Sequence, residues 1–198
     1  MYRKLLTAGL LIAATTFTTS ALAMDGSKLP KKKQTTQGLY LSPTEAYDML
    51  QAEHDQLLFV DVRTRAEVNF LGMPSDADAN IPYMKLSEWY GWDKKKNNFK
   101  MELNDDFLPA LKQRLAQKGL SKDDKIILMC RSGSRSAAAA NLLAKDGFRN
   151  VYTIVEGFEG DKAKHGETKG QRLVNGWKND KLPWTYKLAE SKMYVTND

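Results

Sequence analysis

Cysteine and histidine are nearly absent from this chain of 198 residues, which holds one cysteine, Cys130, and two histidines, His54 and His165. A single cysteine cannot form a disulfide within the chain, and these three residues do not supply the four ligands of a structural zinc site. The apolar stretch at residues 5–17 is short for a membrane-spanning helix, which needs about 20 apolar residues. These absences exclude a disulfide scaffold, a structural zinc site and a polytopic membrane protein.

The first 23 residues have the pattern of a cleavable signal peptide. Arg3 and Lys4 form a positive start, residues 5–17 carry no charge, and residues 21–23 read Ala-Leu-Ala, a small-x-small cleavage pattern. We therefore expect cleavage after residue 23, a periplasmic mature protein and no stable membrane insertion after cleavage. Loss of Arg3 and Lys4 lowers the formal charge of +6 by two, so only a small excess of base remains.

The mature chain divides into three parts by composition. Residues 24–38 are lysine-rich and lack periodic apolar residues, which predicts a solvated, mobile basic linker. Residues 39–160 carry the apolar patterns of one domain. Residues 161–198 are polar with scattered aromatic residues, which is typical of an extension packed on the domain surface.

Base and aromatic residues also occur together at residues 89–100. Trp89, Tyr90 and Trp92 precede a run of three lysines, a combination found in proteins that bind single-stranded nucleic acid. We favour a surface excursion whose aromatic residues pack near the functional site while the lysines stay solvated. No nucleic-acid partner is predicted.

From residue 39 onward, strand-like segments alternate with helix-like segments. The first helix starts at a capping box, in which Ser42 and Glu45 flank Pro43 at the first helical position. The continuous apolar runs predict strands with both faces buried. Expected strands are residues 57–62, 126–129 and 151–155, and expected helices begin near Pro43, after Asn104 or Asp105, and at Ser134. Buried strands separated by helices predict an α/β domain with a parallel sheet covered on both faces.

The lone thiol lies where such a sheet binds ligands, beyond the carboxyl end of a strand. The loop between that strand and the next helix reads Cys130, Arg131, Ser132, Gly133, Ser134, Arg135 and Ser136. Successive amides at a helix N-terminus form a cradle for an anion, and Gly133 permits a backbone conformation that a side chain would penalise. We interpret Cys130 as a nucleophile whose thiolate this loop stabilises.

This loop resembles the active-site loop of the rhodanese family of sulfurtransferases. Residues 61–67 resemble the family's Asp-x-Arg-x-x-x-Glu element, residues 79–82 resemble its Ala-x-Asn-Ile-Pro segment, and residues 156–158 resemble its glycine-bearing turn. The resemblance covers about residues 39–160. It departs at residues 71–78, where the family commonly has Gly-His-Ile, and at the insertion of residues 89–100. It implies a rhodanese-like parallel sheet of about five strands with helices on both faces.

The resemblance also implies a mechanism, in which Cys130 takes sulfane sulfur from a donor such as thiosulfate and passes it from a persulfide to a thiol or cyanide. Residues 131–136 would bind the anionic sulfur, while Asp61 and Arg63 would support the neighbouring loop or form a purely structural ion pair. Arg131 would attract the donor, and Arg135 would brace the loop or hold charge. The expected partners are a small anionic sulfur donor and a thiol acceptor, with no metal and no organic cofactor; no protein partner is indicated.

Two alternatives share this architecture. A cysteine phosphatase or arsenate reductase also holds a thiolate in an amide cradle, but its loop is one residue longer than the four residues between Cys130 and Arg135. A noncatalytic sulfur carrier of the periplasm would use the same thiol without appreciable turnover.

Overall fold

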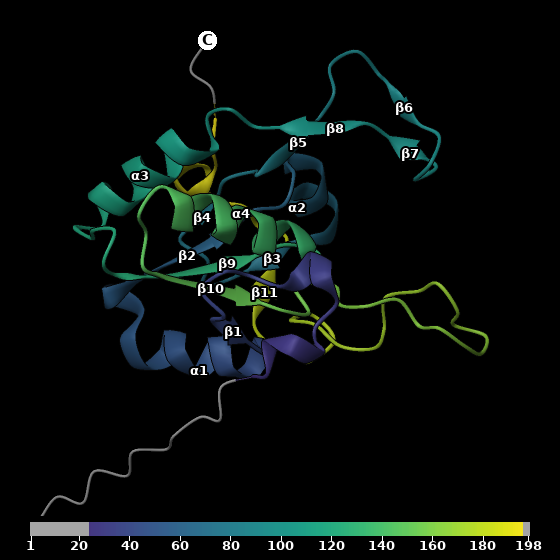
Figure 1. Ribbon diagram of the computed structural model, residues 1–198, viewed down its shortest axis with the longest axis horizontal. Helices are drawn as coiled ribbons and strands as arrows, with labels where there is room; N and C mark the ends of the chain where they lie inside the picture. Colours follow the sequence, from purple (N-terminus) through teal and green to yellow (C-terminus); the bar gives the residue numbers. More distant parts are fainter. Residues whose placement is uncertain (1–23, 196–198) are drawn as a thin grey trace, which may run out of the picture.

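The computed structural model describes residues 24–195 (Figure 1). The predicted signal peptide, residues 1–23, lies outside the described residues. Within residues 24–195, no helix is long and apolar enough to cross a membrane.

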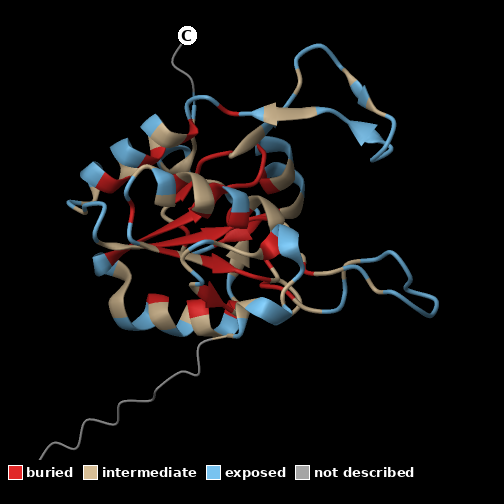
Figure 2. Cartoon of the chain, viewed as in Figure 1, coloured by how far each residue is buried: buried red, intermediate tan, exposed pale blue. Residues whose placement is uncertain are grey.

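A five-stranded parallel sheet forms the centre of the domain, in the order β1-β10-β9-β2-β4. Its members are β1 (Tyr40–Leu41), β2 (Leu57–Asp61), β4 (Ala79–Asn80), β9 (Lys125–Met129) and β10 (Asn150–Ile154). All five residues of β2 are buried, as the continuous apolar run predicted, and Figure 2 shows the buried strands at the centre of the molecule. The predicted α/β fold with about five parallel strands is confirmed.

Within residues 24–195, four α-helices cover the two faces of the sheet. They are α1 (Pro43–Glu53), α2 (Arg65–Leu71), α3 (Phe107–Gln117) and α4 (Ser134–Lys145). Alternate side chains of β2 and β9 share one apolar cluster with α3 and α4, and the intervening side chains share the other with α1 and α2. Figure 1 shows α1 on one side of the sheet and α3 and α4 on the other. Short 3-10 helices complete the set: η1 (Gly26–Lys28), η2 (Lys31–Lys33), η3 (His54–Gln56) and η4 (Glu190–Lys192).

The helix starts follow local sequence signals. At α1, the Ser42 hydroxyl accepts from the Glu45 amide at 3.2 Å while Glu45 accepts from the Ser42 amide at 2.7 Å, so the predicted capping box is present. At α3 the N-cap is Asp106. The prediction that Asn104 or Asp105 caps this helix was wrong, because Asn104 Oδ1 instead accepts from the Asp106 amide at 3.3 Å and orders the preceding turn.

Residues 84–103 form a long excursion built from two antiparallel pairs. Here β5 (Met84–Leu86) pairs with β8 (Met101–Leu103), and β6 (Trp92–Asp93) pairs with β7 (Asn98–Phe99). The excursion projects away from the domain (Figure 1), and Trp89 and Tyr90 are 89% and 85% exposed. The expectation that these aromatic side chains pack near the site was therefore wrong.

The C-terminal extension packs on the domain through Trp177. This side chain is fully buried, with ring centroids 5.5 Å from Phe59 and 6.0 Å from Tyr47. Its amide donates to the Gly157 carbonyl at 2.9 Å. Further along the extension, β11 (Trp184–Thr185) pairs with β3 (Met73–Pro74).

The N-terminal segment is also attached to the domain. Lys33 is only 5% exposed, and its ammonium lies 3.0 Å from the Asp161 carboxylate. The prediction of a freely solvated arm was wrong here, because a buried lysine needs a partner charge, and Asp161 supplies one. Residues 24–38 and the start of the C-terminal extension thus meet beside the domain.

We expect Trp177→Ala to lower the free energy of unfolding by about 3–5 kcal/mol, because it empties a large buried site. Trp89→Ala is the matched control and should change stability by less than about 0.5 kcal/mol, since that ring is exposed. Denaturant unfolding of the three proteins measures both values, and equal effects of the two substitutions would contradict the assignment of Trp177 to the core.

Candidate functional site

Cys130 follows β9 directly and faces the first turn of α4. The Gly133 amide donates to the Cys130 Sγ at 3.2 Å, and the Ser136 hydroxyl lies 3.5 Å from the same sulfur. Ser136 also donates to the Gly133 carbonyl at 3.0 Å. The thiol is 1% exposed. A donor amide, a hydroxyl and the positive end of a 12-residue helix therefore surround one buried sulfur atom.

The loop takes its shape from Gly133, the N-cap of α4, which has φ of +90°. A Cβ at this position would lie 2.1 Å from the Val155 carbonyl oxygen, closer than any side chain permits. Glycine is thus required both for the backbone angle and for the contact between the loop and the turn after β10.

That turn, residues 155–160, holds the loop from the other side. The Cys130 carbonyl accepts from the Phe158 amide at 2.8 Å, and the Arg131 carbonyl accepts from the Glu159 amide at 3.0 Å. A Cβ on Gly157 would lie 2.4 Å from the Cys130 carbonyl oxygen. The backbone on either side of the sulfur is therefore fixed by direct contacts.

Arg135 pairs with Glu67 of α2. Its two terminal nitrogens donate to the two carboxylate oxygens, each at 2.6 Å. Arg131 approaches the same carboxylate, with its Nε 3.8 Å from Oε1. Of the two roles expected for Arg135, this geometry is that of a brace for the loop.

Glu67 is the last residue of the Asp-x-Arg-x-x-x-Glu element at residues 61–67, and no role was predicted for it. It also accepts from the Thr64 amide at 3.0 Å, while its own amide donates to the Thr64 hydroxyl at 3.2 Å, which forms a second capping box. Burial alone would raise the pKa of Glu67, but the hydrogen bonds and charge of Arg135, the Thr64 amide and the charge of Arg131 lower this pKa to about 2. The Thr-x-x-Glu spacing was the available signal for α2.

Asp61 and Arg63 form a fully buried ion pair at the end of β2. Arg63 Nε donates to both Asp61 oxygens at 2.9 and 3.0 Å, and its Nη2 also donates to the Gly72 carbonyl at 2.7 Å. The guanidinium lies 3.9 Å from the centre of the Phe158 ring. Through Arg63, the pair thereby ties Gly72, the residue that ends α2, to the turn that holds the Cys130 loop, and its contacts are those of a structural support.

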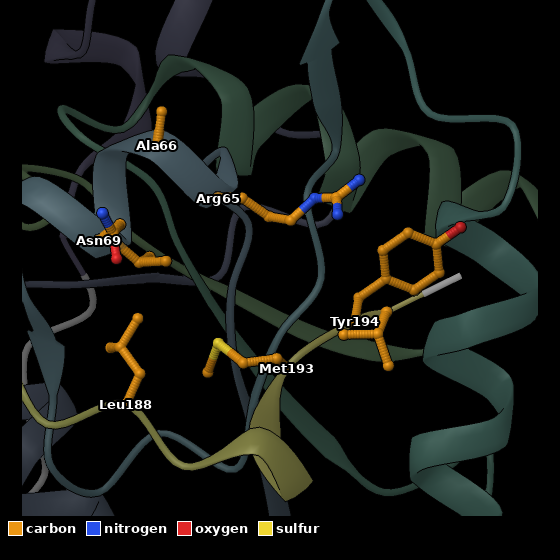
Figure 3. A pocket seen from close by; sticks show the side chains of 8 residues that line it. Arg65, Ala66, Asn69, Leu188, Met193 and Tyr194 are labelled. Atoms are coloured by element: carbon orange, nitrogen blue, oxygen red, sulfur yellow. The ribbon is translucent and has the colours of Figure 1, made fainter. Parts of the chain in front are cut away.

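The cavity shown in Figure 3 lies between α2 and residues 188–195 of the C-terminal extension, and it has a volume of about 360 Å³. Arg65 and Tyr194 border it, and its walls are mostly apolar. The loop of residues 130–136 does not contribute to its lining, which consists of Arg65, Ala66, Val68, Asn69, Leu188, Met193, Tyr194 and Val195. It is separate from the thiol. Within residues 24–195, no cluster of three or more His, Cys, Asp or Glu side chains could hold a metal ion.

Comparison with known proteins places these features in a family. A sequence model of the Rhodanese-like domain matches residues 42–164. The uncharacterized protein RP600 of Rickettsia prowazekii is 33% identical over 144 residues, which cover 72% of this chain and 94% of that protein. Thiosulfate sulfurtransferase 16, chloroplastic, of Arabidopsis thaliana is 33% identical over 118 residues, 60% of this chain and 82% of that protein. The crystal structure of Rv0390 from M. tuberculosis matches with a TM-score of 0.50 and 27% identity, covering 75% of this chain and 97% of that one.

The low pKa of Glu67 predicts a pH-dependent contribution to stability. A carboxylate whose pKa falls from 4.5 to about 2 on folding stabilises the protein above about pH 4.5, and this contribution is lost as the pH falls through about 2. We expect the difference in unfolding free energy between wild type and Glu67→Gln to narrow by about 3 kcal/mol between neutral pH and about pH 2.

Denaturant unfolding at several pH values measures this difference. Asn69→Ala, a neutral substitution on an exposed position of the same helix, is the control and should differ from wild type by the same amount at every pH. A Glu67→Gln difference that stays constant over the range would contradict the ion-pair assignment.

Proposed function

The chain belongs to the rhodanese-like domain family, and from that premise we propose that it is a sulfurtransferase that carries sulfane sulfur on Cys130. The observation that carries the proposal is the hydrogen bond from the Gly133 amide to the Cys130 sulfur, at 3.2 Å, in a loop at the start of α4. The sulfurtransferase relative supports the reaction class.

The reaction takes two displacement steps at sulfur. The Cys130 thiolate attacks the outer sulfur of thiosulfate, a new S–S bond forms, and sulfite leaves with the electron pair of the broken S–S bond. An acceptor thiolate then attacks the outer sulfur of the Cys130 persulfide, becomes a persulfide itself and returns Cys130 as a thiolate. With cyanide as acceptor, the second product is thiocyanate. Thiolate nucleophiles need no general base for either step.

The loop stabilises negative charge on sulfur in both states. In the resting protein the Gly133 amide and the Ser136 hydroxyl face the Cys130 sulfur. In the persulfide, the outer sulfur lies about 2 Å beyond it, where further amides of residues 131–136 supply donors at the helix N-terminus. The contacts of residues 155–160 keep these amides in position without help from the substrate.

Phosphatase chemistry fits the site poorly. A phosphatase loop needs its arginine to contact the transferred phosphoryl group, since that group carries the charge. Here both terminal nitrogens of Arg135 are bound by Glu67, and the loop encloses four residues between Cys130 and Arg135. A single sulfur atom suits this smaller cradle better than a tetrahedral oxyanion.

Intact mass spectrometry tests the persulfide. After incubation with thiosulfate and removal of the donor, we expect the wild-type protein to gain the mass of one sulfur atom and Cys130→Ser to gain none. Sulfate, which has no sulfane sulfur, is the matched control and should leave both masses unchanged. A wild-type protein without added sulfur would refute the proposal.

A cyanide assay separates the enzyme from the carrier. A catalytic sulfurtransferase produces thiocyanate over many turnovers, and we expect this activity to fall by at least about a thousandfold in Cys130→Ser, which lacks the nucleophile. Sulfur uptake without thiocyanate production would favour a noncatalytic carrier. Aryl phosphate hydrolysis that disappears in Cys130→Ser would favour the phosphatase.

We further propose that the protein is exported to the periplasm, on the pattern of residues 1–23. When the full chain is expressed in a Gram-negative host, we expect the periplasmic fraction to contain a protein whose first residue is Met24. N-terminal sequencing measures this. Recovery of the chain in the cytoplasm with Met1 still present would contradict export.

A further inference from the structure

The C-terminal extension is connected to the Cys130 loop through one residue, Gly160. The Gly160 amide donates to the Arg131 carbonyl at 3.2 Å, and the Gly160 carbonyl accepts a hydrogen bond from Nη1 of Arg172. Arg172 lies outside residues 42–164, the range that matches the family. A guanidinium from the extension is thus placed one residue away from the loop backbone.

Two glycines allow this close approach. A Cβ on Gly160, whose φ is +80°, would lie 1.8 Å from the Asn175 carbonyl oxygen. A Cβ on Gly176, whose φ is +102°, would lie 2.5 Å from the Gly160 nitrogen. The backbones of the extension and of the turn after β10 are therefore in direct contact, with no room for a side chain between them.

Asn179 fixes the backbone around Arg172. Its side-chain nitrogen, Nδ2, donates to three backbone carbonyls: that of Arg172 at 3.1 Å, that of Asn175 at 2.8 Å and that of Glu159 at 3.1 Å. The segment that carries Arg172 is consequently held on residues 159–160 at several points. Arg172 has a defined position relative to Arg131 and does not depend on a substrate to adopt it.

Three arginines belong to this region, since Arg131 and Arg135 are loop residues and Arg172 binds the turn that holds the loop. Arg172 is half-buried, and its pKa is lowered by burial and by the like charge of Arg131, against the opposing effect of Glu159, Asp161 and a Cys130 thiolate. Arg131 is 41% exposed, and its Nε has no hydrogen-bond partner within the described residues. Arg135 is occupied by Glu67. Gly160 therefore links the Arg131 backbone to the Arg172 guanidinium, and an anion bound between the two guanidiniums would relieve their mutual repulsion.

We infer that Arg172, together with Arg131, binds the oxyanion end of the sulfur donor, and that the extension selects dianionic donors such as thiosulfate over singly charged thiosulfonates. The inference rests on the proposed sulfur transfer and names its donor class. When the Cys130 thiolate attacks the outer sulfur, charge builds up on the departing sulfite. Two guanidiniums beside that group stabilise the departing charge, which increases the rate of the first step.

The test compares donors that differ by one charge. Methanethiosulfonate anion has the shape of thiosulfate, with a methyl group in place of one charged oxygen, and it loads Cys130 by the same displacement with methanesulfinate as the leaving group. We expect Arg172→Gln to lower kcat/KM for persulfide formation about ten- to hundredfold with thiosulfate, and clearly less with methanethiosulfonate. Arg172→Lys should keep most of the thiosulfate rate, because it keeps the charge.

Two controls separate donor binding from structural damage. Lys169→Gln removes an exposed charge from the same extension and should change neither rate by more than about twofold. Discharge of a preformed persulfide to 2-mercaptoethanol, a neutral thiol, should be unchanged in Arg172→Gln. Equal losses with both donors, or a thiosulfate rate equal to that of Lys169→Gln, would overturn the inference.

Thiosulfate binding can be measured separately from sulfur transfer, in a protein that lacks the nucleophile. Calorimetry of thiosulfate binding to Cys130→Ser requires no reaction, and we expect Cys130→Ser/Arg172→Gln to bind at least about tenfold more weakly. Absence of sulfur uptake with intact, Arg172-dependent binding would refute the proposed function alone. Equal binding by the two proteins would refute the role of Arg172 alone.

Discussion

The structure around the thiol depends on one largely buried carboxylate, that of Glu67. It caps α2 by accepting from the Thr64 amide, and it binds both terminal nitrogens of Arg135 across the site. Arg135 belongs to the first turn of α4, the helix whose N-terminus faces Cys130. This carboxylate therefore joins the two segments that follow the central strands β2 and β9. Without it, the Arg135 guanidinium would be left without a partner in a largely buried position, which is costly.

Rigidity on three sides explains how a loop of this kind can hold an anionic sulfur. Glu67 holds the loop through a side chain, and the turn of residues 155–160 holds it through backbone hydrogen bonds at Cys130 and Arg131. The extension adds the third contact, through Arg172, whose guanidinium donates to the Gly160 carbonyl. Amides that are already oriented cost no reorganisation when charge arrives on the sulfur. The proposed chemistry follows from this arrangement, in which the protein supplies oriented donors and the sulfur supplies the reactivity.

Local patterns in the sequence predicted the features that local physics determines. Apolar runs of strand length located β2, β9 and β10, the capping box at Ser42 located the start of α1, and the order of elements placed Cys130 at the carboxyl edge of the sheet. Glu67 ends the Asp-x-Arg-x-x-x-Glu element of residues 61–67, but its partner Arg135 lies 68 residues further along the chain. No spacing rule connects residues at that distance, so the ion pair became evident only in the folded chain.

The same limit applies to the N-terminal segment and to the excursion of residues 84–103. A lysine-rich segment is usually solvated, but Lys33 is buried because Asp161, 128 residues away, supplies a partner charge. Trp89 and Tyr90 were expected to pack near the site, as part of a surface excursion whose lysines stay solvated. They are exposed because the β-hairpins of residues 84–103 project from the domain. In both cases the outcome depends on tertiary neighbours that composition does not reveal.

The central claim is that this loop holds a second sulfur atom on Cys130. A crystal structure of thiosulfate-treated protein, with the sulfur atoms located by their anomalous scattering, tests it most directly. We predict two bonded sulfur positions at Cys130, with the outer one enclosed by the amides of residues 131–136 and with Arg135 still bound to Glu67. A single sulfur at Cys130, with thiosulfate intact elsewhere or absent, would contradict the account.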